Sequence, residues 1–219
     1  MATETPTSIY SDRIPRVHVT YSVFKRVLDL VGTSLILVML SPLLLAIAIA
    51  IRATSPGAVI YRQKRVGRYG VEFDFLKFRS MYTDADSRLS ELLQQGNEKG
   101  KVIFKMKNDP RVTPVGKFLR KYSLDELPQF FNVLRGEMSL VGPRPPLPRE
   151  VENYNDYAFR RLSVPQGLTC LWQICGRSDT TFDEWMALDI FYVENMSFWL
   201  DLKIFLKTPT AILRAEGAY

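Results

Sequence analysis

The chain has 219 residues, the length of one ordinary domain, and 47% of them are hydrophobic, which excludes a chain that is disordered throughout. Lysine and arginine total 29 against 23 aspartates and glutamates, so the net charge of +6 favours an anionic partner such as phosphate, nucleic acid or a lipid surface. One histidine, His18, and two cysteines, Cys170 and Cys175, exclude a histidine-based triad, a paired-cysteine zinc site and a disulfide scaffold. Both cysteines are expected to be reduced thiols, and acid, base or nucleophile chemistry falls to carboxylates.

An apolar run of 22 residues extends from Leu30 to Ile51 without a charge, the length of a membrane-spanning helix. It starts too far into the chain for a cleaved signal peptide. Ser41-Pro42 lies near its middle, where proline removes a backbone donor and should kink or break the helix. Each arm would then reach roughly 14 to 17 Å, about half of the hydrocarbon thickness.

Basic residues flank the apolar run on both sides, so both ends favour the cytoplasmic face. A re-entrant helix hairpin satisfies both flanks, and a kinked spanning helix is the alternative. The Ser41 hydroxyl is expected to cover the backbone carbonyl that Pro42 leaves unpaired. The flanking residues are Arg13, Arg16, Lys25 and Arg26 before the run and Arg52, Arg62, Lys64, Arg65 and Arg68 after it.

The expected fold class is α+β and helix-rich, with a polar tail over 1–21, the membrane helix over 22–52 and one soluble-facing domain over 53–219. The segments AVIYRQ and VEFDFLKF predict a β-hairpin. The pattern is helical over 113–135, and four prolines exclude a helix in SLVGPRPPLPRE. The segment FYVENMSFWLDLKIFLKTP predicts an amphipathic helix that lies on the bilayer or faces the core.

Asp125 and Glu126 are the strongest candidates for chemistry. Ser123 and Glu126 match a helix capping box, which is the structural alternative. However, the two carboxylates lie in a strongly basic part of the chain, which indicates an anion site with an acidic centre. Such a site fits phosphoryl transfer from a diphosphate, with Mg²⁺ as the natural cation and an ionised carboxylate able to attack phosphorus and form an acyl phosphate. Neighbouring helical residues point about 100° apart, so the two carboxylates should have different roles.

Arg144 is the second candidate, because Pro143 and Pro145 stiffen the turn that presents its planar guanidinium to phosphate. A surface arginine in a rigid loop is the alternative. Lys77 and Arg79, in the segment KFRSM, form a weaker third candidate. The common nucleotide, dehydrogenase and zinc-hydrolase motifs do not occur, and neither does a nucleic-acid-binding motif.

Several segments together resemble the bacterial monotopic phosphoglycosyl transferases, which begin exopolysaccharide, O-antigen or capsule repeat units. The resemblance covers nearly all of residues 22 to 215, and its central block is highly specific. The segments are KRVLDL, the Ser41-Pro42 break, SPGAVIYRQKRVG, FLKFRSM, NDPRVTPVGKFLRKYSLDELPQFFNVLRGEMSLVGPRP, VPQGLTCLWQICGRS and LDIFYVENMSFWLDLKI.

The resemblance implies transfer of a sugar 1-phosphate from a UDP-sugar to polyprenyl (undecaprenyl) phosphate, with release of UMP. By motif position Asp125 is the nucleophile and Glu126 its partner, with Mg²⁺ held by both. Arg144 would meet phosphate or the uridine end beside Pro143, and Arg120 is a further phosphate contact. The resemblance also implies a re-entrant helix broken at Ser41 and Pro42. The expected location is the bacterial inner membrane, with the active site on its cytoplasmic face.

The departures from the family pattern are small. Cys170 replaces a frequent glycine, and Leu171-Trp172-Gln173 looks more like members that handle glucose or galactose than those that handle N-acetylated sugars. The chain is expected to be the minimal catalytic form. Its expected partners are a UDP-sugar, polyprenyl phosphate and membrane lipid, with a homodimer as a further candidate and nucleic acid not expected. The main alternative function is a non-catalytic basic scaffold at the membrane.

Overall fold

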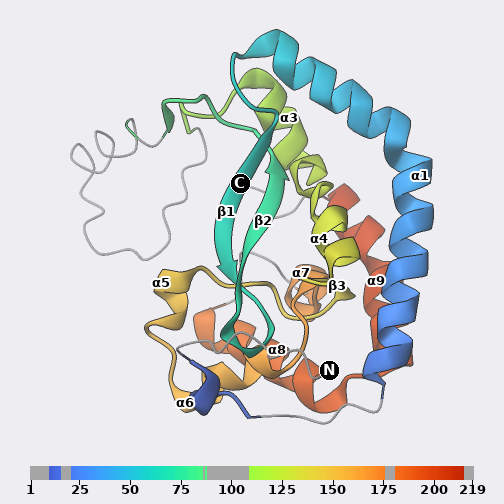
Figure 1. Cartoon of the computed structure of the whole chain (residues 1–219), viewed down its shortest axis with the longest axis vertical. Helices are drawn as coiled ribbons and strands as arrows, with labels where there is room; N and C mark the ends of the chain where they lie inside the picture. Colours follow the sequence, from blue (N-terminus) through green and yellow to red (C-terminus); the bar gives the residue numbers. More distant parts are fainter. Residues whose placement is uncertain (1–9, 16–20, 86, 88–108, 176–180, 215–219) are drawn as a thin grey trace, which may run out of the picture.

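The computed structural model describes residues 10–15, 21–85, 87, 109–175 and 181–214 of the chain. Within these residues the fold is helix-rich with two-stranded sheets, which confirms the α+β class. Figure 1 shows α1 along one side of the molecule, with the β1–β2 hairpin and the shorter helices beside it. The α-helices are α1 (Ser22–Thr54), α3 (Pro114–Lys121), α4 (Gln129–Arg135), α5 (Pro148–Val151), α6 (Asp156–Phe159), α7 (Leu171–Cys175), α8 (Phe182–Asn195) and α9 (Phe198–Arg214). The 3₁₀ helices are η1 (Ser11–Arg13), η2 (Arg68–Gly70), η3 (Leu124–Glu126) and η4 (Arg160–Ser163). The strands are β1 (Ile60–Val66), β2 (Glu72–Phe78), β3 (Ser139–Val141) and β4 (Gly167–Thr169).

Helix α1 contains the apolar run and continues through Pro42. The predicted distortion is present, because the helix changes direction partway along its length (Figure 1). The Ser41 hydroxyl donates to the Val38 carbonyl at 2.8 Å. That carbonyl lies four residues before Pro42, which cannot supply its usual donor. The expected pair of separate arms is therefore replaced by one bent helix, in which a hydroxyl substitutes for the missing backbone donor.

Both parts of α1 pack against the rest of the same domain. Before Pro42, three partly buried side chains of α1 contact the main core. After Pro42, two buried side chains of α1 form a second cluster with residues of β2 and α3. Among the described residues, α1 is the one helix whose length and composition would allow it to cross a membrane. The contacts are made by Ile36, Leu37 and Leu40 with the main core, and by Ile47 and Ile51 with Phe78 and Leu119.

The predicted β-hairpin is confirmed. Strands β1 and β2 are antiparallel, with a register that runs from Ile60 opposite Phe78 to Val66 opposite Glu72. Strand β2 turns Phe73 and Phe75 into the main hydrophobic core. Strands β3 and β4 form a second, parallel pair. Helices α4, α8 and α9 supply half of the other buried side chains of the main core.

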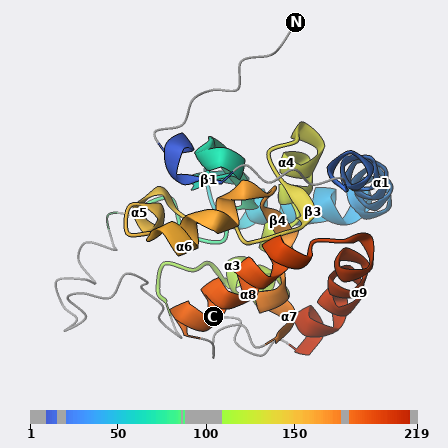
Figure 2. The same ribbon diagram turned by 90° about the horizontal axis from the view of Figure 1, so that it is seen from below.

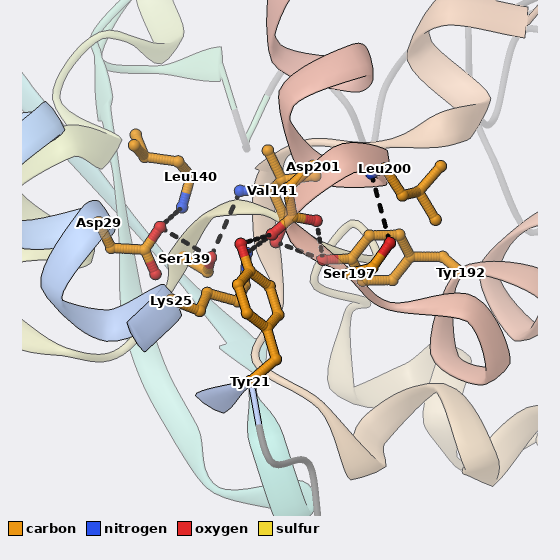
Figure 3. A network of polar contacts seen from close by, with 10 residues as sticks. All are labelled: Tyr21, Lys25, Asp29, Ser139, Leu140, Val141, Tyr192, Ser197, Leu200 and Asp201. Carbon is orange, nitrogen blue, oxygen red and sulfur yellow. Dashed lines mark hydrogen bonds and ion pairs between the residues drawn. The ribbon is translucent and has the colours of Figure 1, made fainter. Parts of the chain in front are cut away.

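A buried polar network joins the start of α1 to α8, α9 and β3 (Figure 3). Lys25 Nζ lies 2.5 Å from Asp201 Oδ2, and the Tyr192 hydroxyl donates to Asp201 Oδ1 at 2.7 Å. Asp29 accepts hydrogen bonds from the Ser139 hydroxyl and the Leu140 amide at 3.1 and 3.0 Å. Figure 2, which views α1 nearly end-on, shows α9 beside it. The polar residues near the start of the membrane-helix candidate are thus used to fasten it to the domain.

The predicted amphipathic C-terminal segment forms two helices, α8 and α9, because the chain leaves helical geometry between them at Met196. Helix α9 is amphipathic as expected: Ile204 is fully buried, whereas Trp199 and Leu206 are 75% and 64% exposed. At the other end of the chain, part of the polar tail packs on the domain. Ile14 is buried in a cluster with α5, α6 and η4, and Arg13 NH2 lies 2.9 Å from Asp156 Oδ1.

Candidate active site

Asp125 and Glu126 lie on the short 3₁₀ helix η3, between α3 and α4. The predicted helix over 113–135 is wrong at this point, because Ser123 adopts a left-handed conformation with φ of 54° and ends α3. The capping box, which was the structural alternative, is absent, since the Ser123 side chain accepts no cap hydrogen bond. A non-glycine residue with positive φ costs about 1–2 kcal/mol. The surrounding packing therefore holds the two carboxylates on a strained turn instead of a regular helix.

Glu126 is held by two cations from separate elements. Its Oε1 atom lies 2.9 Å from Lys77 Nζ on β2 and 2.8 Å from Arg144 NH2 on the turn after β3. The three side chains are between 14% and 20% exposed, so their charges interact in a partly dry environment. Burial by itself would raise the pKa of Glu126, but the charges of Arg144 and Lys77 outweigh it and hold the pKa well below the usual range.

Asp125 has a different environment, although it is the adjacent residue. Its side chain is buried, and it forms no hydrogen bond or ion pair with any residue that the structure describes. Burial raises the pKa of Asp125 above its ordinary value, the Glu126 charge adds to that effect, and Lys77, Arg120 and Arg144 act in the opposite direction. The two neighbouring carboxylates were expected to have different roles, and their environments do differ. Both lie on the short 3₁₀ helix η3, so the dipole of an α-helix N-terminus is not the cause of the difference.

The remaining predicted basic residues separate into two groups. Arg120, on α3, donates from Nε to the Ser80 hydroxyl at 3.0 Å, and it is close enough to Asp125 to influence its pKa. Arg79 points elsewhere: its NH2 group donates to the carbonyl and hydroxyl of Ser55, at 2.8 and 2.7 Å, where α1 ends. Arg79 therefore fastens α1 to the hairpin, and the structure does not bring it to the carboxylates.

The turn that presents Arg144 begins where two glycines meet. Gly142 N donates to the Thr169 carbonyl at 3.0 Å, and Gly167 N donates to the Pro143 carbonyl at 2.8 Å. A Cβ atom on Gly142 would lie 2.3 Å from the Pro165 carbonyl oxygen, and one on Gly167 would lie 2.1 Å from Gly142 N. This backbone approach requires both glycines. It places Arg144, which follows Pro143, beside the dyad formed by Asp125 and Glu126. The buried thiol of Cys170 lies close enough to influence Arg144, and burial raises the pKa of this thiol to about 12.

The arrangement is suited to a phosphate-bearing ligand. Three cations, Lys77, Arg120 and Arg144, surround two carboxylates, which leaves an excess of positive charge. The site also fits a hard divalent cation, because Asp125 has no protein partner in the described part of the chain and Glu126 uses only its Oε1 atom. Mg²⁺ typically takes one or two carboxylates and completes its shell with water and substrate phosphate. The described residues hold no cluster of three or more acidic, histidine or cysteine ligands.

Sequence reasoning missed two residues that build the site. Asn132, on α4, is fully buried; its Oδ1 accepts from the Leu76 amide at 3.1 Å and its Nδ2 donates to the Asp74 carbonyl at 2.7 Å. It thereby fixes β2 next to Lys77. An asparagine inside the apolar segment FFNVL was the available signal. Arg161 is also fully buried and contacts the Arg144 backbone, but nothing in its local sequence distinguishes it from the neighbouring Arg160.

Comparison with known proteins agrees with the earlier resemblance. Residues 20–215 match the family described as "Bacterial sugar transferase". The "Galactosyl transferase CpsE" of Streptococcus agalactiae is 46% identical over 91% of this chain and 44% of its own length. The "UDP-glucose:undecaprenyl-phosphate glucose-1-phosphate transferase" of Klebsiella pneumoniae is 47% identical over 90% of this chain and 42% of its own. The "Exopolysaccharide production protein ExoY" of Rhizobium meliloti is 43% identical over 89% of this chain and 88% of its own.

The relatives differ in the share of their own length that matches this chain. It spans less than half the length of the S. agalactiae and K. pneumoniae proteins and most of the R. meliloti protein. Each of these matches covers about nine tenths of the present chain. The family match over residues 20–215 includes α1, Asp125 and Glu126.

Proposed function

The chain belongs to the bacterial sugar transferase family, and from that premise we propose that it transfers a sugar 1-phosphate from a UDP-sugar to polyprenyl phosphate. The observation that carries the proposal is the difference in ion-pair partners between the two adjacent carboxylates. Glu126 is fixed by two cations, whereas Asp125 is buried close to the same cations without a partner of its own among the described residues. One carboxylate is thus free to react while the other organises the charges around it.

In the proposed first step, a carboxylate oxygen of Asp125 attacks the sugar-bearing phosphorus of the UDP-sugar. The bond between that phosphorus and the bridging oxygen breaks, and its electron pair leaves with UMP. An oxygen of polyprenyl phosphate then attacks the same phosphorus, and the bond to Asp125 breaks to restore the carboxylate. Desolvation supports the first step, because it makes the ionised carboxylate more basic and more nucleophilic than one in water.

Arg144, Lys77 and Arg120 are proposed to act on the negative charge of the diphosphate. Arg144 presents a planar guanidinium suited to two phosphate oxygens, and its hydrogen bond with Glu126 keeps it directed toward the dyad. Mg²⁺, held by Asp125 or the free oxygen of Glu126, would supply further neutralisation of the diphosphate. A titration of the purified protein with Mg²⁺, followed by thermal unfolding, would test this site without turnover.

The proposed donor is a UDP-hexose, galactose or glucose. The segment Leu171-Trp172-Gln173 supports this, and so do the relatives named for galactose or glucose transfer. The proposed acceptor, undecaprenyl phosphate, follows the name of the K. pneumoniae relative, and the proposed pathway, exopolysaccharide synthesis, follows the name of the R. meliloti relative.

We also propose that α1 is re-entrant and that the domain lies on the cytoplasmic face of the inner membrane. The start of α1 is tied to α9 through Lys25 and Asp201, and its end is tied to β2 through Arg79 and Ser55. A helix of 33 residues would be about 50 Å long if straight, longer than the roughly 30 Å hydrocarbon core. Because one domain holds both ends, entry and exit on the same side satisfy these contacts, whereas spanning would break one set.

The topology can be tested with single cysteines at Ser22, Val38 and Thr54 in a Cys175→Ser background. Cys170 is buried and needs no replacement. A membrane-impermeant thiol reagent applied to inverted vesicles is expected to label positions 22 and 54, and position 38 only after detergent. Labelling of only one of the two ends would contradict re-entry.

The function is tested by UMP release from a panel of UDP-sugars, with Mg²⁺ and undecaprenyl phosphate, using detergent-purified protein. Release with a UDP-hexose is expected, and Asp125→Asn should abolish it. The non-catalytic scaffold alternative predicts no release with any donor. Release that Asp125→Asn leaves unchanged would keep the activity but reject the assigned nucleophile.

A further inference from the structure

The turn from Pro143 to Pro146 lacks the donors that normally hold a turn together. Three of its four residues are prolines, which have no backbone N–H. Each of its four carbonyls instead accepts a hydrogen bond from a separate donor outside the turn. These donors are Gly167 N to Pro143 at 2.8 Å, Arg161 NH2 to Arg144 at 2.7 Å, Arg65 NH1 to Pro145 at 2.9 Å and Val66 N to Pro146 at 2.9 Å.

Arg161 is the more deeply buried of the two side-chain donors, Arg161 and Arg65. Its side chain is 0% exposed, and its NH2 group lies 2.6 Å from Asp189 Oδ2, which is 1% exposed. Its NH1 group donates to the Tyr154 hydroxyl, and its guanidinium lies 5.0 Å from the centre of the Trp185 ring. The same NH2 group that pairs with Asp189 also donates to the Arg144 carbonyl. Contacts with Asp189, Tyr154 and Trp185 therefore hold the Arg161 guanidinium in place independently of its contact with the turn.

A buried ion pair is a poor device for stability alone. Removing two charges from water costs several kcal/mol per ion, and apolar residues of similar volume often give an equally stable protein. The pair of Arg161 and Asp189 points to a role beyond stability, because Arg161 also contacts Arg144. The contacted atom is the backbone carbonyl of the same residue whose side chain donates to Glu126 at 2.8 Å.

We propose that Arg161 is a positioning residue that sets the direction of Arg144 toward phosphate through the Arg144 backbone carbonyl. The proposal rests on the proposed function, in which Arg144 binds phosphate. Lysine cannot replace it, because an ammonium group is a compact point charge and cannot serve Tyr154, Asp189 and the carbonyl in the fixed planar geometry of a guanidinium. Loss of this contact should let the turn move and weaken phosphate binding without removing any group that touches the ligand.

The test is a double-mutant cycle on the affinity for UMP, measured by calorimetry, together with thermal unfolding of each variant. Arg161→Lys is expected to weaken UMP binding about tenfold. In an Arg144→Lys background it should cause less than a twofold further loss, because the affected side chain has already been altered. Independent, multiplicative losses, or unchanged affinity in Arg161→Lys, would overturn the proposal.

A matched control separates positioning from general stability. Arg26 also donates two guanidinium hydrogen bonds to backbone carbonyls, Val133 at 2.6 Å and Leu134 at 2.8 Å, but on α4. Arg26→Lys should lower the unfolding temperature and leave UMP affinity within twofold of the wild type. An equal loss of affinity in Arg26→Lys and Arg161→Lys would mean that Arg161 is only structural.

Tyr154→Phe provides a second variant if Arg161→Lys does not fold. It removes one partner of Arg161 and retains the cation, so a two- to fivefold loss of UMP affinity is expected, and this loss should vanish in the Arg144→Lys background. No loss would overturn the proposal. UMP release from a UDP-sugar by the wild-type protein is measured separately. If the wild type releases UMP but the variants bind UMP with unchanged affinity, only the role of Arg161 is rejected. If the wild type neither binds nor releases UMP, the proposed function is rejected and this inference with it.

Discussion

Two of the buried charged clusters in the described part of the chain differ in one respect. In the network at the start of α1, each carboxylate has partners: Asp201 pairs with Lys25 and Tyr192, and Asp29 accepts from Ser139 and Leu140 (Figure 3). In the cluster on η3, Glu126 is paired twice and Asp125 has no partner among the described residues. In the first cluster, protein groups supply the partners of both carboxylates, and these contacts link α1 to α9 and β3. The second leaves one buried carboxylate without a partner in the described part of the chain, which is the difference that the proposed function requires between a reactive site and a structural one.

The largest expected effect comes from Asp125→Asn, which should lower turnover by about 10³-fold or more because the proposed nucleophile is lost. The same substitution should stabilise the protein at neutral pH, since it removes an unpaired buried charge. UMP release and denaturant unfolding measure the two effects. A variant that is both inactive and less stable would show that Asp125 has a structural role instead.

Asp201→Asn should give the opposite result. It leaves Lys25 as a buried charge without its partner, and breaking such a pair typically costs about 3–5 kcal/mol of unfolding free energy. The protein that remains folded should retain its donor KM, because the network does not touch the dyad. A large change in KM at unchanged stability would contradict the separation of the two clusters.

The pH dependence of stability should differ in sign between Asp125 and Glu126. The pKa of Asp125 is raised, so the folded state keeps its proton longer than the unfolded state and loses stability as pH rises from about 4 through the folded pKa. The pKa of Glu126 is lowered, so its contribution is present above about pH 4.3 and is lost as pH falls through the folded pKa. Asp125→Asn should therefore exceed the wild type in stability only above about pH 4.

Glu126→Gln is the matched partner in this pH experiment. It should be less stable than the wild type at neutral pH, because Lys77 and Arg144 lose their counter-charge, and the difference should shrink in acid. Unfolding curves of the three proteins between pH 3 and pH 8, values chosen to bracket about pH 4, measure both effects. Parallel curves for the two variants would contradict the unequal environments of the carboxylates.

The smallest expected effect is that of Ser41→Ala. The Ser41 hydroxyl supplies one hydrogen bond to the Val38 carbonyl, and such a bond contributes about 0.5–1.5 kcal/mol. Helix content should be retained, with a modest decrease in thermal stability in detergent. A large loss of helix would mean that Ser41, and not the packing of both parts of α1, holds the bend.

Local sequence patterns predicted the elements whose stabilising contacts are close in the chain. The apolar run with Ser41 and Pro42, the β-hairpin, and the proximity of Arg120 to Asp125 all follow from near neighbours or alternation. The left-handed Ser123 and the roles of Asn132 and Arg161 depend on contacts with residues far apart in the chain, such as Arg161 with Asp189. Arg79 illustrates the same limit, because its basic character was recognised but its partner, Ser55, lies 24 residues earlier in the chain, at the end of α1.

The central proposal is that the buried carboxylate of Asp125 forms a covalent bond to phosphorus. The most direct test is intact-mass measurement of the purified protein after incubation with UDP-galactose or UDP-glucose in the absence of polyprenyl phosphate. A mass increase equal to one hexose phosphate, located by peptide mapping to Asp125 and absent in Asp125→Asn, is the predicted result. An adduct that persists in Asp125→Asn, or UMP release that occurs only when the acceptor is present and without any adduct, would contradict the claim.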